Sequence, residues 1–200
     1  MKKFKYTFEG EDKTLKVLDH DLFSLSELFH ENTKERRINP TTFDITFQDV
    51  MSQSFKRYKN TERLPLKRSN SPPDKQFDEV LLGRRSNREF GRKPLRITDV
   101  SYILEHTYSV VEKNPQRFPW HYRSIPSAGA LYPLEVYPCI FHVEEIANGI
   151  YHYQAQEHVL ELLNKGQYAG KIADICLNQE FIKSSSLFIA VTAIFDRTRF

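Results

Sequence analysis

The sequence predicts an α+β fold around one main core, and three observations lead to this prediction. The chain has 200 residues, 40% of them hydrophobic and 13% aromatic, which suffices for one sizeable core but not for two ordinary domains. Apolar residues recur at helical spacing in several segments. Apolar runs rich in strand-forming residues occupy other segments, mainly in the second half of the chain.

Residues 1–73 are expected to form a helical appendage and a linker. Apolar residues share one helical face within residues 24–32, and a longer periodic stretch runs from 42 to about 58. The next stretch, YKNTERLPLKRSNSPPDKQ, loses this periodicity and gathers prolines, serines and charges, which is typical of a linker. We therefore place the main domain over residues 74–200.

Two helices are expected at the start of the main domain. Asp74 is a candidate N-cap for the first, and Thr98 for the second. The first would place Phe77, Val80 and Leu81 on one face, and the second would turn inward Val100, Ile103, Leu104 and Val111. A loop containing Trp120 follows.

Strands dominate the rest of the chain. LEVYPCIFHV is expected to be a strand in which Pro138 indicates an edge position, a bulge or the first residues. GIYHYQAQEHVLELL predicts two short strands around a turn, and residues 166–183 a helix with inward Tyr168, Ile172, Ile175 and Ile182. LFIAVTAIF, residues 187–195, has the length and composition of a strand buried on both faces.

Composition and spacing argue against several functional classes. Lys and Arg exceed Asp and Glu by three, 29 against 26, so bulk charge does not indicate a nucleic-acid partner. Cys139 and Cys176 lie in apolar segments without metal-ligand spacing and are expected in the core, and the histidines show no paired spacing, so no metal is expected. Neither a signal peptide nor a membrane span is recognisable, so a cytoplasmic protein is expected.

The segment RRSNR, residues 84–88, gathers three arginines and a serine hydroxyl where a helix is expected to end. Arginine presents a planar fork that matches two phosphate oxygens at once, so this group could bind a phosphate. The alternative is that the cations merely offset the dipole at the helix C-terminus.

The segment PSAGALYPLEVY, residues 126–137, begins with residues of almost no side-chain bulk. Backbone N–H and C=O groups there could approach a flat heteroaromatic ligand such as an isoalloxazine, and the flanking prolines would hold the turn in place. The alternative is a tight loop that leads into a strand.

Together, RRSNREF, PSAGALYPLEVY, GIYHYQAQEHVLELL and the N-terminal LFHENTK resemble the FMN-dependent nitroreductase superfamily. The closest resemblance is to its SagB-type dehydrogenases, the azoline oxidases of ribosomal-peptide modification. The resemblance runs from about Phe23 to the end and implies a mixed sheet flanked by helices. It assigns FMN binding to Arg84, Arg85, Ser86, Arg88, Pro126, Ser127, Ala128, Gly129, Ala130 and Leu131.

The resemblance implies an oxidation of thiazoline or oxazoline rings to thiazole or oxazole in a precursor peptide. It implies cyclodehydratase subunits and the precursor peptide as partners, and a homodimer or a complementing second chain. The Lys-Tyr pair that the family uses for proton chemistry would follow residue 200, so the domain is expected to be incomplete and the catalytic residues remain unassigned. The alternatives are a non-catalytic or split subunit that binds the modifying complex and, more weakly, a generic flavin reductase of nitro compounds or quinones.

Overall fold

The computed structural model describes residues 55–68, 74–91, 93–113 and 121–198. The chain divides into two units after Asp44, and every described residue belongs to the unit Ile45–Phe200. The helix expected at 24–32, most of that expected at 42–58, and Trp120 lie outside the described residues. Residues 55–58, which are described, are not helical.

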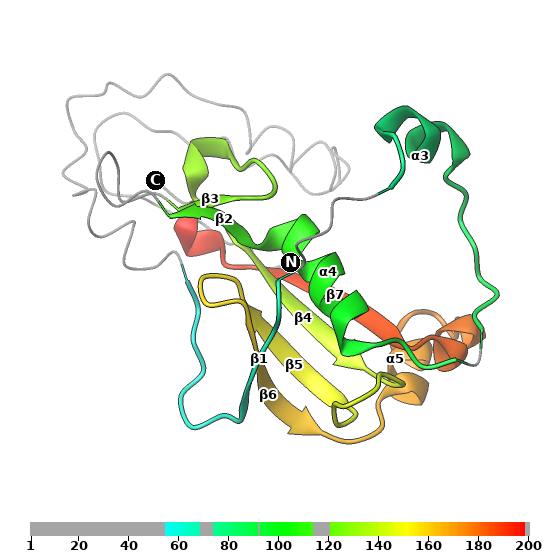
Figure 1. Ribbon diagram of the computed structural model, residues 1–200. Coiled ribbons are helices and arrows are strands. Elements are labelled where there is room, and N and C mark those ends of the chain that lie inside the picture. The colour runs from blue at the N-terminus through cyan, green and yellow to red at the C-terminus, as the bar shows by residue number, and fades with distance from the viewer. Residues whose placement is uncertain (1–54, 69–73, 92, 114–120, 199–200) are drawn as a thin grey trace, which may run out of the picture. The chain divides into compact units, whose positions relative to one another are not determined.

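A five-stranded antiparallel sheet is the centre of this unit (Figure 1). Its order is β1 (Arg63–Pro65), β6 (Val159–Lys165), β5 (Gly149–Gln154), β4 (Leu134–Ile140) and β7 (Leu187–Ala193). β2 (Val110–Lys113) and β3 (His121–Arg123) form a separate pair. The helices are α3 (Phe77–Gly83), α4 (Ile97–Tyr108) and α5 (Ala169–Ile175), with short 3-10 turns η2 (Ala128–Ala130), η3 (Glu180–Ser184) and η4 (Phe195–Arg197). The expected α+β class is confirmed.

The core has two parts because successive side chains of a strand point to opposite faces of the sheet. Val100 and Leu104 of α4 pack with Ile140 of β4 in one cluster. The neighbouring Cys139 packs with Ala173 of α5 in the other. Helices therefore cover both faces, and the expectation of a core cysteine is confirmed for Cys139.

The helix caps differ from the prediction. α3 begins after Gln76 rather than Asp74, and α4 begins after Arg96 rather than Thr98. The Asp99 carboxylate accepts the backbone N–H of Arg96 at 3.2 Å and pairs with its guanidinium at 2.7 Å. An ion pair replaces the hydroxyl cap, which residue preferences do not anticipate.

Several side chains expected to face inward are exposed. The apolar residues of α3 are largely exposed, with Phe77 at 76%, and Val111 is 60% exposed on β2 rather than on a helix. The helix expected over 166–183 is broken into α5 and η3, because Leu177 and Asn178 adopt φ values of 60° and 58°. This break leaves Ile175 79% exposed.

One expected feature of the strands is confirmed, and three expected features are corrected. The hairpin β5–β6 lies where GIYHYQAQEHVLELL predicts it. β4 is a central strand, and Pro138 stands in its fifth position, directly before the two residue pairs that join β4 to β5. β7 pairs with β4 at an edge of the described sheet and leaves Val191 54% exposed, so it is not buried on both faces. The expected linker contributes β1.

Candidate functional site

The turn at residues 127–132, called here the 127–132 turn, is held by its own hydrogen bonds. The N–H groups of Ala130 and Leu131 donate to the carbonyls of Ser127 and Ala128 at 3.0 and 3.3 Å. The Ser127 hydroxyl accepts the N–H of Tyr132 at 3.0 Å. Gly129 has φ 59°, and a Cβ there would lie 3.3 Å from the Leu131 side chain.

Two backbone donors of the 127–132 turn take no part in this internal network. The N–H groups of Ala128 and Gly129 make no hydrogen bond to any residue that the structure describes, and both residues are exposed. This geometry suits a flat ligand that carries hydrogen-bond acceptors along one rim.

Tyr132 anchors the turn to the rest of the unit. Its hydroxyl accepts the backbone N–H of Arg123 at 3.3 Å, and its carbonyl accepts Nη1 of Arg197 at 2.9 Å. The Arg123 guanidinium lies 4.6 Å from the centre of the Tyr132 ring and 4.5 Å from that of Tyr108. Burial lowers the pKa of Arg123 below its ordinary value.

The arginine segment, Arg84 to Arg88, is exposed throughout. Nη1 of Arg85 donates to the carbonyls of Leu82 and Arg84 at 3.0 and 2.8 Å, so this side chain caps the C-terminus of α3 as the alternative interpretation expects. The Arg88 guanidinium lies 5.7 Å from the centre of the Phe181 ring. The side chains of Arg84 and Ser86 make no hydrogen bond or ion pair within the described part of the chain.

The arginine segment and the 127–132 turn do not meet within one chain. The arginine segment contacts Phe181 of η3, which leads into the first residue of β7. The turn leads into the first residue of β4, Leu134, which pairs with the last residue of β7, Ala193. The two segments therefore flank opposite ends of a seven-pair antiparallel ladder, about 20 Å long.

A buried charged network joins β4, β5, β6 and η4, and the sequence analysis did not find it. Nε2 of His152 lies 2.7 Å from Oε2 of Glu135, and its Nδ1 lies 2.9 Å from Oε2 of Glu161. Nη1 of Arg197 lies 2.6 Å from Oε1 of Glu135. All four side chains are at most 6% exposed. We call this set the His152 network.

The electrostatics of Glu135 follow from this network. Burial raises the pKa of Glu135, but the hydrogen bond from His152 and the charge of Arg197 together outweigh burial and hold the pKa below its ordinary value. Glu135 is therefore ionised in the folded protein. One signal in the sequence could have revealed part of the network, because a hairpin with its loop at 155–158 pairs His152 with Glu161 directly.

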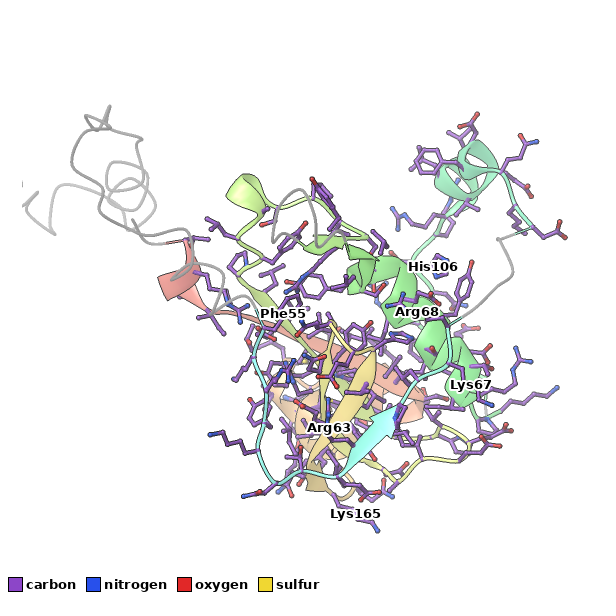
Figure 2. The ribbon with its side chains drawn as sticks, turned by 60° about the vertical axis from the view of Figure 1, so that its left-hand side comes forward. Phe55, Arg63, Lys67, Arg68, His106 and Lys165 are labelled. Atoms are coloured by element: carbon purple, nitrogen blue, oxygen red, sulfur yellow. The ribbon has the colours of Figure 1, made fainter. Side chains whose placement is uncertain are left out.

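A second buried polar cluster joins the β5–β6 hairpin to α4. Nδ1 of His158 lies 2.7 Å from the Tyr153 hydroxyl, and its Nε2 lies 2.9 Å from the Ser101 hydroxyl. Ser101 donates to the carbonyl of Lys67 at 2.6 Å. Figure 2 shows Lys67 and Arg68 beside α4, on the segment that follows β1. His152 and His158 are both buried and hydrogen-bonded.

Comparison with known proteins places this architecture in a family. The model of the nitroreductase family matches residues 81–200. A "putative nitroreductase" of Methanocaldococcus jannaschii is 30% identical over 122 residues, which cover 61% of this chain and 59% of that protein. The chain thus spans about three fifths of the length of this curated relative. Within the described residues, no helix combines the length and apolarity that a membrane crossing requires.

Solved structures share the fold. A "putative nitroreductase" of Anabaena variabilis matches with a TM-score of 0.63 and 23% identity, over 86% of this chain and 32% of that one. A "putative nitroreductase" of Ralstonia eutropha matches with a TM-score of 0.54 and 22% identity, over 68% of this chain and 58% of that one. An Escherichia coli microcin synthetase complex matches with a TM-score of 0.44 and 19% identity, over 85% of this chain and 60% of that one. A TM-score this low supports no inference about this chain. The fold is nitroreductase-like, and by the match over 81–200 the chain belongs to the nitroreductase family.

Proposed function

We propose that this chain is an FMN-dependent oxidoreductase that converts thiazoline or oxazoline rings of a ribosomally made peptide to thiazole or oxazole. Members of the nitroreductase family typically use a flavin. The observation that carries the cofactor proposal is the 127–132 turn, with the open N–H groups of Ala128 and Gly129. The substrate proposal rests on the SagB-type motifs of the sequence.

The residues present fit FMN in chemistry. The open N–H groups of the 127–132 turn would donate to acceptor atoms on the rim of the ring system. In the arginine segment, Arg84 and Ser86 have side chains uncommitted within the described residues, and Arg88 has one that only stacks. The side chains of Arg84, Ser86 and Arg88 are therefore suited to bind the FMN phosphate, whereas the Arg85 side chain already caps α3.

The separation of the two segments supports a site built from two copies of the chain. One FMN touching both segments would need the arginine segment of one copy beside the 127–132 turn of the other. A two-fold dimer would make two such sites. The exposed apolar residues of α3, including Phe77 and Leu82 at 76% and 75%, form the type of surface that a second copy covers.

The proposed chemistry is a two-electron oxidation that aromatises the ring. When bound, FMN would accept a hydride from a ring carbon of the azoline while a base takes a proton, so the ring loses two hydrogens and two electrons. The residues of this chain would bind the cofactor and orient the ring against it. The base is not assigned to a described residue.

FMN binding tests the proposal first. We would measure the visible spectrum and the FMN dissociation constant of the purified chain, alone and co-expressed with the protein encoded next to it. Replacing Arg84 and Arg88 by Ala is expected to weaken binding by at least about tenfold, since each charge-assisted contact contributes about 1.5–3 kcal/mol. Lys171→Ala, another exposed cation, is the matched control and should leave the affinity unchanged.

The outcomes separate the candidate functions. A chain that binds FMN and removes two hydrogens per ring from an azoline-containing peptide supports the proposal. Rapid NADH oxidation with nitro compounds or quinones, without activity on the peptide, indicates the generic reductase instead. A chain that stays colourless alone and with its neighbour contradicts the enzyme and favours a peptide-binding or complex-binding subunit.

A further inference from the structure

The His152 network is connected to the 127–132 turn by an unbroken series of contacts. His152 contacts Glu135 at 2.7 Å, Glu135 pairs with Arg197 at 2.6 Å, and Arg197 donates to the carbonyl of Tyr132 at 2.9 Å. Tyr132 has φ 44°, a conformation that residues other than glycine adopt only at a cost. The turn therefore ends at a strained residue whose carbonyl is held by a buried guanidinium.

The geometry at His152 requires a proton on each ring nitrogen. An ionised carboxylate can only accept hydrogen bonds, and each nitrogen faces one at 2.7 and 2.9 Å. With an imidazolium, each of the two carboxylates accepts a hydrogen bond from a ring nitrogen. With a neutral ring, one nitrogen lone pair would face a carboxylate oxygen at hydrogen-bond distance, which is strongly unfavourable in a protein interior.

Two aromatic rings, a lysine and a further arginine surround His152 and its two carboxylates. The rings of Tyr58, from the segment before β1, and Tyr137 of β4 lie 5.1 and 5.3 Å from the imidazole centre. The Lys56 ammonium donates to the Tyr137 hydroxyl at 2.9 Å, outside the buried set. On the Glu161 side, Nε of Arg63 on β1 lies 3.6 Å from Oε1, and the Tyr58 N–H donates to Oε2 at 3.2 Å.

Loss of the ring proton would weaken the hold on Glu135. Glu161 keeps the backbone N–H of Tyr58 as a donor, whereas Glu135 accepts no backbone N–H from the described residues, so a neutral ring would keep its remaining proton on Nε2, toward Glu135. The ring would nevertheless lose its positive charge, and a weaker neutral hydrogen bond would replace the charge-assisted one that holds the Glu135 carboxylate and, through it, Arg197. Arg197 is the link to Tyr132.

We infer that His152 is a positioning residue: as an imidazolium it holds Glu135 and Arg197, and through them the backbone of Tyr132, so that the 127–132 turn is shaped to receive its ligand. The identity of that ligand as FMN rests on the proposed function. The inference implies that FMN affinity falls as the pH rises through the loss of this proton.

Nitrogen NMR tests the inference without any cofactor. In uniformly ¹⁵N-labelled protein at pH 6, the His152 ring, assigned with His152→Gln, should show two protonated nitrogens. As the pH is raised, the amide signals of Ala130, Leu131 and Tyr132 should move with the same midpoint as the ring signal. A neutral ring with one protonated nitrogen at pH 6, or turn amides that ignore the His152 titration, would overturn the inference.

Variants separate positioning from general folding. At fixed pH, His152→Gln should shift the turn amides and weaken FMN binding by about tenfold, a typical coupling between sites. Arg197→Gln should shift the same amides while His152 stays protonated. His142→Gln, at an exposed histidine that follows β4, is the matched control and should do neither. Should the variants not fold, the wild-type titration decides alone.

The cofactor measurement distinguishes the two proposals. If the turn follows His152 but FMN does not bind at any pH, the positioning inference holds and the proposed function fails. If FMN binds with an affinity independent of pH while His152 loses its proton, the positioning inference fails and the proposed function survives.

Discussion

Lowering the pH from 7 toward 4.5 should lower the free energy of unfolding, because the folded protein holds the His158 ring neutral. Ser101 uses its single proton for the Lys67 carbonyl, so its oxygen accepts from Nε2 of His158 and leaves Nδ1 to accept the Tyr153 hydroxyl. This arrangement needs a neutral ring. Burial, followed by the nearby positive charge of Arg68, lowers the pKa of His158 to about 4.

The sign and size of the effect follow from linkage. Between pH 6.5, the ordinary pKa of histidine, and about 4, the unfolded chain binds a proton that the folded protein does not. The stabilisation is therefore fully present above pH 6.5 and is lost as the pH falls toward 4. The difference between the two pKa values sets an upper bound of about 3 kcal/mol on the free energy of unfolding lost.

Urea unfolding followed by circular dichroism at several values between pH 7 and 4.5 measures this loss. The pKa values of Glu135 and Asp99 lie below the ordinary 4.5 and 3.8, so the stability that they contribute is lost mainly below pH 4.5. In His158→Gln, whose amide offers an NH₂ donor group and a carbonyl acceptor but no titratable proton, the slope should largely disappear, whereas it should persist in the exposed control His106→Gln. Equal slopes in wild type and His158→Gln would refute the reasoning.

Three further outcomes are expected. Leu104→Ala, at a fully buried position of α4, should lower the free energy of unfolding by about 2–5 kcal/mol in urea titrations. Gly129→Ala, at φ 59°, should cost about 1 kcal/mol, whereas Gly170→Ala, with open space around its Cβ and a helical backbone, should stabilise by roughly 0.5–1 kcal/mol; equal effects would contradict the turn geometry. Burial raises the pKa of Cys139 to about 11, so iodoacetamide should label the half-buried Cys176 first in a mass-spectrometric time course.

The sequence predicts those parts of the fold that depend on local pattern. The hairpin β5–β6 is confirmed because its strands alternate around a short turn, and the apolar positions Val100 and Leu104 are buried as their helical spacing indicates. The break after α5 was missed because two consecutive left-handed residues, Leu177 and Asn178, carry no glycine signal. Local pattern also does not show which strand faces other elements cover, and the prediction that β7 is buried on both faces is therefore wrong.

The candidate site likewise has parts that the sequence predicts and parts that depend on tertiary structure. The segments around Arg84 and Gly129 can be predicted because the chemistry of each is written in consecutive residues. The sequence does not show that these segments flank opposite ends of the β4–β7 ladder. The His152 network requires the register between β4 and β5 and the return of the chain at Arg197, and both depend on tertiary structure.

The position of β1 at the sheet edge bears on the order in which this unit folds. Arg63 pairs with Glu161, 98 positions later, whereas β5 and β6 are joined by four residues. Closing the longer loop carries the larger entropic cost, so the hairpin is expected to form within microseconds and β1 to dock late. The segment that carries Tyr58 docks with it, and its backbone N–H reaches Glu161. The contacts that this segment and β1 make with Glu161 are therefore expected to form late on the folding pathway.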